Sequence, residues 1–175
     1  MRSSSRPMLD DGRGAGTARR VSVEQRDVIN APRDVFGSFE TGSAQETRDL
    51  GERLGGLLRA RDVVLLFGEL GAGKTVFAKG IASGVGIAVE QVTSPSFTLM
   101  NVHEGRVRMI HLDLYRIETF AQAEQAGLLD VFNTDAIVVV EWPEKIVDVC
   151  RARARVEVRI YVVGPNERRI LISEI

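Results

Sequence analysis

The residues with the clearest chemical pattern form a glycine-rich segment that begins at Gly68. Its sequence matches G-x-x-x-x-G-K-[ST], the pattern of a phosphate-binding loop. The loop consists of Gly68, Glu69, Leu70, Gly71, Ala72, Gly73, Lys74 and Thr75. Glycines let the backbone adopt conformations closed to other residues, so that successive N–H groups can point at an anion. The segment is therefore predicted to bind the phosphates of a nucleotide.

The last two residues of this loop supply the charge and the metal ligand that a triphosphate requires. We expect Lys74 to bridge the β and γ phosphates as a catalytic cation, and the Thr75 hydroxyl to bind Mg²⁺. A helix that begins near Lys74 would add the positive end of its dipole. The predicted cofactors are therefore a nucleoside triphosphate and Mg²⁺.

Two carboxylates follow apolar segments and are the candidates for the remaining catalytic groups. Glu141 ends the run Ala136-Ile-Val-Val-Val140, where a Walker B acid lies in a parallel sheet, and we expect it to bind Mg²⁺ with Thr75. Asp113 ends another predicted strand and could hold a metal-bound water or orient the attacking one. The alternatives are a strand-end surface carboxylate for Glu141, and a cap or a salt bridge to Arg116 for Asp113.

Other chemically capable side chains lack a pattern that assigns them a role. The turn Thr93-Ser-Pro-Ser96 could order around a γ phosphate, but the residues alone favour an ordinary proline turn. His103 and His111 have no partner cluster in the sequence, so we interpret both as strand residues. Trp142 is the only tryptophan and is interpreted as a packing residue.

These residues require a sheet whose strands end near one another, and the apolar periodicity predicts one. Segments 62–67 and 136–140 are apolar on both faces, as central parallel strands must be. Further strands are predicted at 35–40, 98–103, 106–113, 156–162 and 168–172. Helices are predicted after a capping box at Ser43, over 74–85 and within 118–132. The fold class is therefore α/β, a P-loop NTPase-like mixed β-sheet with central parallel strands and antiparallel additions, flanked by helices.

Length and composition limit the remaining possibilities. A chain of 175 residues is long enough for one domain, which we place at residues 34–175. Residues 1–33 are rich in arginine, glycine and serine, and we expect a flexible N-terminal extension, with an RNA-contacting arm as the alternative. The formal charge of −1 gives no global attraction to nucleic acid or membrane. Because Cys150 is the only cysteine and no long apolar run is present, we expect a cytoplasmic protein with no membrane partner.

The type of nucleotide and of reaction follows from motifs that the chain lacks. GTPases usually carry Asn-Lys-x-Asp, and none of the three lysines follows an asparagine, so ATP is expected. A small-molecule kinase needs an acceptor site and usually an arginine-bearing lid. No segment after the phosphate loop has the clear pattern of either feature. A kinase remains the alternative function, and a non-catalytic nucleotide-binding regulator is a third.

Several segments together resemble the TsaE family of bacterial ATPases of tRNA threonylcarbamoyladenosine biosynthesis, from about Phe39 to the C-terminus. They occur in the order and approximate spacing of that family. The segments are the phosphate loop, Thr93-Ser-Pro-Ser-Phe97, His111-Leu-Asp-Leu-Tyr-Arg116, Gly127 and Ile137-Val-Val-Val-Glu-Trp-Pro143. The chain departs from the family at residues 120–123, where a Pro-Glu-Glu-Leu run is common, and in the tail before Phe39.

The resemblance implies roles for the same residues. Thr75 and Glu141 would hold Mg²⁺, and Asp113 would assist at the metal or the water. Trp142 would lie beside the active site. The turn at 93–96, in which Ser96 replaces the threonine of the family, would act as a switch-like segment.

The resemblance also implies a function and partners. The chain would bind and hydrolyse ATP as an accessory protein required for threonylcarbamoyladenosine modification of tRNA next to the anticodon. It would act on the TsaD–TsaB heterodimer, meet tRNA only through that complex, and hydrolyse ATP weakly alone. The adenine would lie against Ala44 and Pro165.

Overall fold

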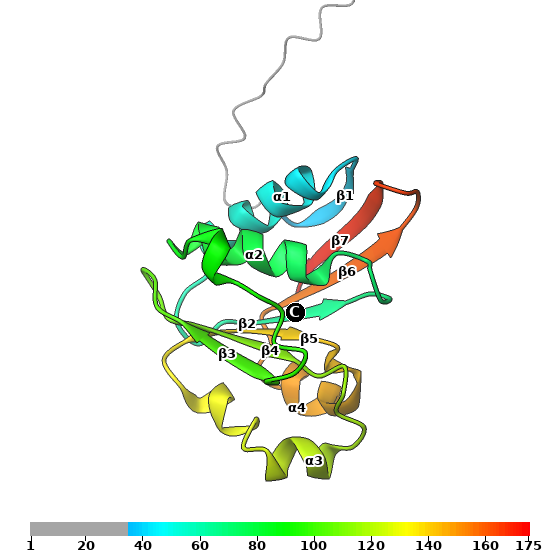
Figure 1. Cartoon of the computed structure of the whole chain (residues 1–175). Coiled ribbons are helices and arrows are strands. Elements are labelled where there is room, and N and C mark those ends of the chain that lie inside the picture. The colour runs from blue at the N-terminus through cyan, green and yellow to red at the C-terminus, as the bar shows by residue number, and fades with distance from the viewer. Residues whose placement is uncertain (1–34) are drawn as a thin grey trace, which may run out of the picture.

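The computed structural model describes residues 35–175, and the prediction of a flexible extension at residues 1–33 lies outside this part of the chain. A seven-stranded sheet runs through it in the order β1-β7-β6-β2-β5-β4-β3 (Figure 1). The strands are β1 (Gly37–Thr41), β2 (Val63–Phe67), β3 (Met100–His103), β4 (Met109–Asp113), β5 (Ile137–Glu141), β6 (Val156–Val162) and β7 (Arg168–Glu174). The helices are α1 (Ala44–Leu57), α2 (Lys74–Gly84), α3 (Phe120–Gln125) and α4 (Val147–Arg151), with short 3-10 helices η1 (Val89–Gln91), η2 (Asp130–Asn133) and η3 (Pro143–Ile146).

The centre of the sheet is parallel, as its apolar strands predict. β2 lies between β6 and β5 and is parallel to both, and β4 is parallel to β5. β3, β7 and β1 add antiparallel pairs. Every residue of β2, β4 and β5 is buried. The predicted fold class, an α/β mixed sheet with central parallel strands and flanking helices, is confirmed.

Helices on the two faces of the sheet enclose two apolar cores. α1 and α2 lie on one face, and α3 and α4 on the other (Figure 1). Phe77 and Ile81 of α2 belong to the first core, and Leu65 and Cys150 to the second. Because successive strand residues enter opposite cores, a slip of one residue would exchange the two sets, and this fixes the register. Among residues 35–175, none of the helices has the length and apolar character needed to cross a membrane.

α1 and α2 pack backbone against backbone through four glycines. These are Gly51 and Gly55 on α1, and Gly80 and Gly84 on α2. A Cβ atom at any of them would fall on a backbone oxygen of the opposite helix, and at Gly55 it would meet the Ile81 carbonyl. The contact places the start of α2 beside the start of α1. The apolar stripe of α1 alone did not predict this close approach.

Two helical regions differ from the prediction. Segment 118–132 divides into α3 and η2, because Gly127 takes a left-handed φ of 69° between them. The Thr119 side chain caps α3, so a helix starts here although the chain departs from the family at this point. η3 and α4 were not predicted, although Ile146 and Cys150 recur at helical spacing and both pack in the second core.

Candidate active site

The phosphate loop connects the carboxyl end of β2 to the amino end of α2. Its φ is 78° at Gly71 and 107° at Gly73, the residue before α2, and side chains rarely tolerate either value. Gly68 has a φ of 152°, and a Cβ there would lie 2.7 Å from the Ile160 carbonyl oxygen. The loop therefore turns closely against β6 in a way that only glycine permits. It has the strand and helix context that its motif requires.

Lys74 is held by its own loop. The side chain is buried, and its ammonium donates to the carbonyl oxygens of Gly68 at 2.7 Å and Glu69 at 2.9 Å. The ammonium also lies 3.6 Å from the centre of the Trp142 ring. Burial lowers the pKa of Lys74, and the charges of four nearby carboxylates oppose that shift. A phosphate oxygen would meet a cation that already lacks most of its water.

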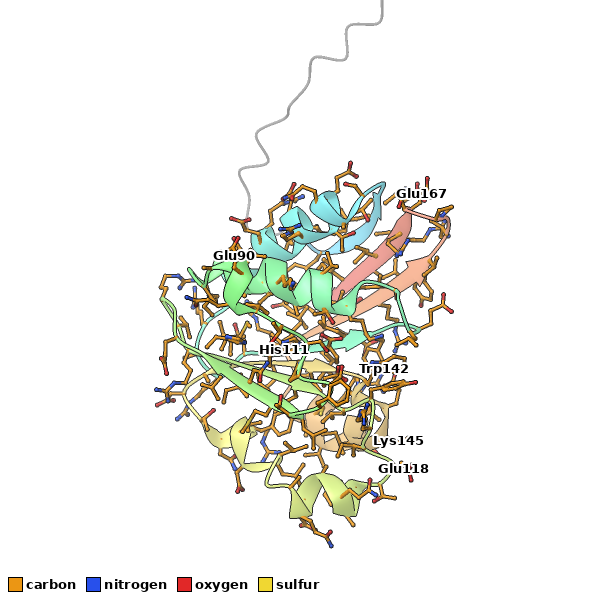
Figure 2. All side chains as sticks on the ribbon, viewed as in Figure 1. Glu90, His111, Glu118, Trp142, Lys145 and Glu167 are labelled. Atoms are coloured by element: carbon orange, nitrogen blue, oxygen red, sulfur yellow. The ribbon has the colours of Figure 1, made fainter. Side chains whose placement is uncertain are left out.

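Glu141 is the centre of a hydrogen-bonded group at the end of β5. The Thr75 hydroxyl lies 2.9 and 3.1 Å from its two carboxylate oxygens and donates to them. His111 Nε2 lies 2.8 Å from Glu141 Oε1, and the imidazole is completely buried (Figure 2). Because an ionised carboxylate only accepts, the hydrogen of this bond is on Nε2. His111 lies in β4, as its interpretation as a strand residue predicted, but it has a partner in Glu141 that the sequence analysis did not find. Its spacing of two from Asp113 puts both on one face of β4, and this signal was available in the sequence.

Asp113 lies beside Glu141, since the two are register partners in β4 and β5. Its Oδ2 accepts hydrogen bonds from the Ser94 and Ser96 hydroxyls, at 2.9 and 2.5 Å. Its Oδ1 accepts from the Tyr115 backbone N–H at 3.0 Å, which is the local cap considered as an alternative for this residue. The two serines attach the turn at 93–96 to the candidate catalytic carboxylate.

Aromatic rings border this group. Trp142 follows β5 with φ 59° and ψ 52°, a left-handed conformation of the kind that recurs at functional sites. The Tyr115 ring lies 5.0 Å from it at an angle of 53°. Trp142 thus lies at the site as well as packing against the core. Arg116 lies 4.2 Å over the Phe97 ring, and the ion pairs of residues 35–175 do not include the salt bridge considered between Arg116 and Asp113.

One pocket of about 360 Å³, which we name the metal-side pocket, collects most of the side chains described above. They are Lys74, Thr75, Ser94, Ser96, Asp113, Tyr115, Glu141 and Trp142, and His111 is not among the lining residues. The Asp, Glu, Ser and Thr side chains of this pocket offer oxygen ligands, which Mg²⁺ prefers. Residues 35–175 contain no cluster of three or more His, Cys, Asp or Glu side chains suited to caging a metal. Thr75 and Glu141 fit a magnesium ion that binds with a phosphate ligand.

Ala44 and Pro165 lie together in a second pocket of about 140 Å³, which shares two loop glycines with the first and which we name the base-side pocket. Arg168 also lines it, and sequence reasoning missed this residue. Its guanidinium donates to Ala72 O at 2.8 Å and to Gly71 O at 3.3 Å, so it attaches β7 to the phosphate loop. Nothing in the sequence marks it, because it occupies an ordinary strand position.

Comparison with known proteins gives the family. A sequence model of the family described as "Threonylcarbamoyl adenosine biosynthesis protein TsaE" matches residues 41–170. The chain belongs to the TsaE family. The resemblance seen in the sequence motifs is thereby confirmed, and the TsaE match includes the phosphate loop, both carboxylates and Trp142.

Individual TsaE proteins are similar over most of their length. The tRNA threonylcarbamoyladenosine biosynthesis protein TsaE of Treponema pallidum is 36% identical over 131 residues, which are 75% of this chain and 96% of that protein. The protein of the same name from Mycobacterium tuberculosis (strain H37Rv) is 36% identical over 160 residues, 86% of this chain and 94% of that protein. The crystal structure of Bacillus subtilis YdiB superposes with a TM-score of 0.61 at 29% identity, covering 78% of this chain and 84% of that chain.

Proposed function

We propose that this chain binds and hydrolyses ATP as an accessory protein of tRNA threonylcarbamoyladenosine modification, acting in the cytoplasm on a complex of TsaD and TsaB homologues. The observation that carries the proposal is the convergence of Lys74, Thr75, Asp113 and Glu141 on one pocket beside a phosphate loop. Family membership supports the pathway. The single cysteine agrees with a reducing compartment.

The chemistry of each group suggests its role. The loop amides and the start of α2 would face the triphosphate, and Lys74 would exchange its two carbonyl contacts for phosphate oxygens. Thr75 and Glu141 would hold Mg²⁺, which neutralises developing charge on the phosphates when bound. Asp113 would orient the attacking water, and Ala44 and Pro165 in the base-side pocket would border the adenine.

The contacts within the site favour slow hydrolysis by the chain alone. Lys74 bonds loop carbonyls, Thr75 bonds Glu141, and Asp113 bonds the two serines of the turn at 93–96. Each contact must rearrange before its group can act on a nucleotide. A partner that orders the turn would therefore accelerate the reaction, as in other nucleotide-driven switches.

Association with the partner complex tests this function. Purified chain is mixed with TsaD and TsaB homologues in the presence of Mg²⁺ and ATP, ADP or no nucleotide, and co-elution is measured. We expect association that depends on ATP and hydrolysis that rises in the complex. Absence of association under all three conditions would overturn the accessory role, and a phosphorylated metabolite in a substrate screen would favour the small-molecule kinase instead.

A further inference from the structure

A third pocket, larger than the other two, adjoins the phosphate loop and has no role in the function proposed above. Its volume is about 600 Å³, and we name it the lateral pocket. Phe67, Trp142 and Tyr161 provide its aromatic lining, Glu69 and Glu144 are its acids, and Arg159 also lines it. It adjoins the metal-side pocket at Trp142, which lines both pockets.

The aromatic lining already accommodates a guanidinium group. Arg159 lies 4.5 Å over the Phe67 ring and forms an ion pair with Glu157 at 2.6 Å, a carboxylate that Arg151 also contacts at 3.0 Å. Guanidinium groups stack on aromatic faces more readily than other cations, because they are planar and weakly hydrated. Tyr161 also lines the pocket and is 46% exposed, so its ring is accessible for a second stack. Trp142 borders the same pocket, although its ring already contacts the Lys74 ammonium and the Tyr115 ring.

The two acids of the lateral pocket have no cation within ion-pair distance among residues 35–175. Glu69 and Glu144 are both exposed, and neither takes part in a salt bridge there. With Glu141 and Asp113 they make up the four carboxylates whose charges act on Lys74. Glu69 and Glu144 thus add two negative charges to the edge of the site at which Asp113 and Glu141 also lie, and a bound triphosphate would add more. A surface complementary to this edge must be cationic.

We propose that the lateral pocket receives an arginine side chain of a protein partner, with its guanidinium against Trp142 and Tyr161 and paired with Glu144 and Glu69. The proposed function supplies only the identity of that partner, the TsaD–TsaB complex. A protein fits better than a nucleic acid, because the acids would repel phosphates. The apolar residues Val162 and Val163 beside the pocket are also exposed, at 41% and 51%, as expected at a protein interface.

Charge removal at Glu144 tests the pairing in the complex. The affinity of each variant for the TsaD–TsaB homologues is measured in the presence of a slowly hydrolysed ATP analogue. Each variant is first shown to be saturated with this analogue. Glu144→Gln keeps the side-chain shape, and we expect about tenfold weaker association and a smaller salt dependence. The control is Glu90→Gln, an exposed glutamate in η1, which follows α2 at the end away from the phosphate loop (Figure 2). Equal affinities of the two variants would overturn the inference and leave the proposed function standing.

A second measurement tests the arginine site without the partner complex. It remains informative if no complex forms, although the absence of a complex would itself overturn the proposed function. Trp142 is the only tryptophan, so its fluorescence reports on the pocket. The chain is titrated with N-acetyl-arginine methylamide and with the corresponding uncharged citrulline compound. We expect a saturable change with the arginine compound alone, lost in Glu144→Gln. Identical responses to both compounds would overturn the arginine site.

Discussion

At the residue scale, Glu141 connects three elements of the site. Thr75 lies in the phosphate loop and His111 in β4, and both donate to this carboxylate at the end of β5. When Thr75 turns toward a metal ion, the His111 bond would still hold the carboxylate in place. If Glu141 binds Mg²⁺ as proposed, His111 would position this ligand without binding the metal itself.

Substitution of His111 should weaken the response of the reaction to magnesium and, because the imidazole is completely buried, should also lower the free energy of unfolding. His111→Ala is expected to raise the Mg²⁺ concentration for half-maximal hydrolysis, or to lower kcat, by about 10- to 100-fold. His111→Gln retains an N–H donor and should recover part of the loss. His103→Gln, on β3, is the control and should leave the Mg²⁺ dependence unchanged. A Mg²⁺ dependence that is identical in wild type and His111→Ala, with both folded, would show that the bond has no positioning role.

Lys74 should contribute mainly to phosphate binding. Lys74→Ala removes the buried ammonium that faces the loop, and we expect ATP affinity to fall by about 100-fold with loss of measurable hydrolysis. Lys79→Ala lies on the same helix and serves as the control. ATP binding is measured by calorimetry and turnover by phosphate release. Normal turnover by Lys74→Ala would show that the reaction site lies elsewhere.

The candidate site was predictable where its chemistry is local in sequence. The loop is one continuous motif, and Asp113 and Glu141 were found because each ends an apolar strand. Arg168 was missed because its contact with the loop depends on which strands are neighbours. The attachment of the 93–96 turn to Asp113 depends on the same long-range geometry, so residue types alone favoured an ordinary turn.

At the element scale, the closeness of α1 and α2 gives a sharp test of packing. Gly55→Ala would put a Cβ on the Ile81 carbonyl oxygen, and we expect destabilisation by about 1–3 kcal/mol or more. Gly56→Ala, on the exposed side of the same helix, has nothing within 4 Å and should stabilise by about 0.5–1 kcal/mol. Urea unfolding of both variants measures the difference. Similar free energies of unfolding for the two would contradict the close packing.

Apolar periodicity predicted the type of each helix or strand more accurately than it predicted its length. The predicted capping box begins α1, with Glu46 N donating to Ser43 Oγ at 3.1 Å. The buried runs at β2 and β5 were recognised because no polar residue interrupts them. α4 is only five residues long, too short for an apolar stripe to stand out. Boundaries at α3 depended on a turn at Gly127 whose backbone conformation the sequence did not reveal.

At the scale of the whole molecule, the parallel centre of the sheet creates the candidate site. Thr75 and Glu141 are 66 residues apart in sequence, yet they meet because β2 and β5 are parallel neighbours. Asp113 joins them from β4 at the same edge. The mixed sheet was predicted, but its order was not, because burial patterns do not state which strands pair. Pairing of β1 with the last strand, β7, is the clearest example.

Cys150 offers a probe of global unfolding. It is completely buried on α4, and burial raises the pKa of its thiol to about 12. We expect a thiol reagent at pH 8 to react slowly with folded chain and rapidly in urea. Because the unfolded thiol ionises near pH 9, the free energy of unfolding should fall as pH rises from about 9 toward 12, less steeply in Cys150→Ala. Rapid labelling of folded chain at pH 8 would contradict this burial.

The loop from Gly68 to Thr75 is proposed to bind a nucleoside triphosphate, and every other role proposed for the site depends on this binding. Isothermal titration calorimetry of the folded chain with Mg²⁺ and a slowly hydrolysed ATP analogue tests it most directly. We predict a saturable heat for one site per chain, greatly weakened in Lys74→Ala. No heat of binding from well-folded wild-type chain would contradict the account.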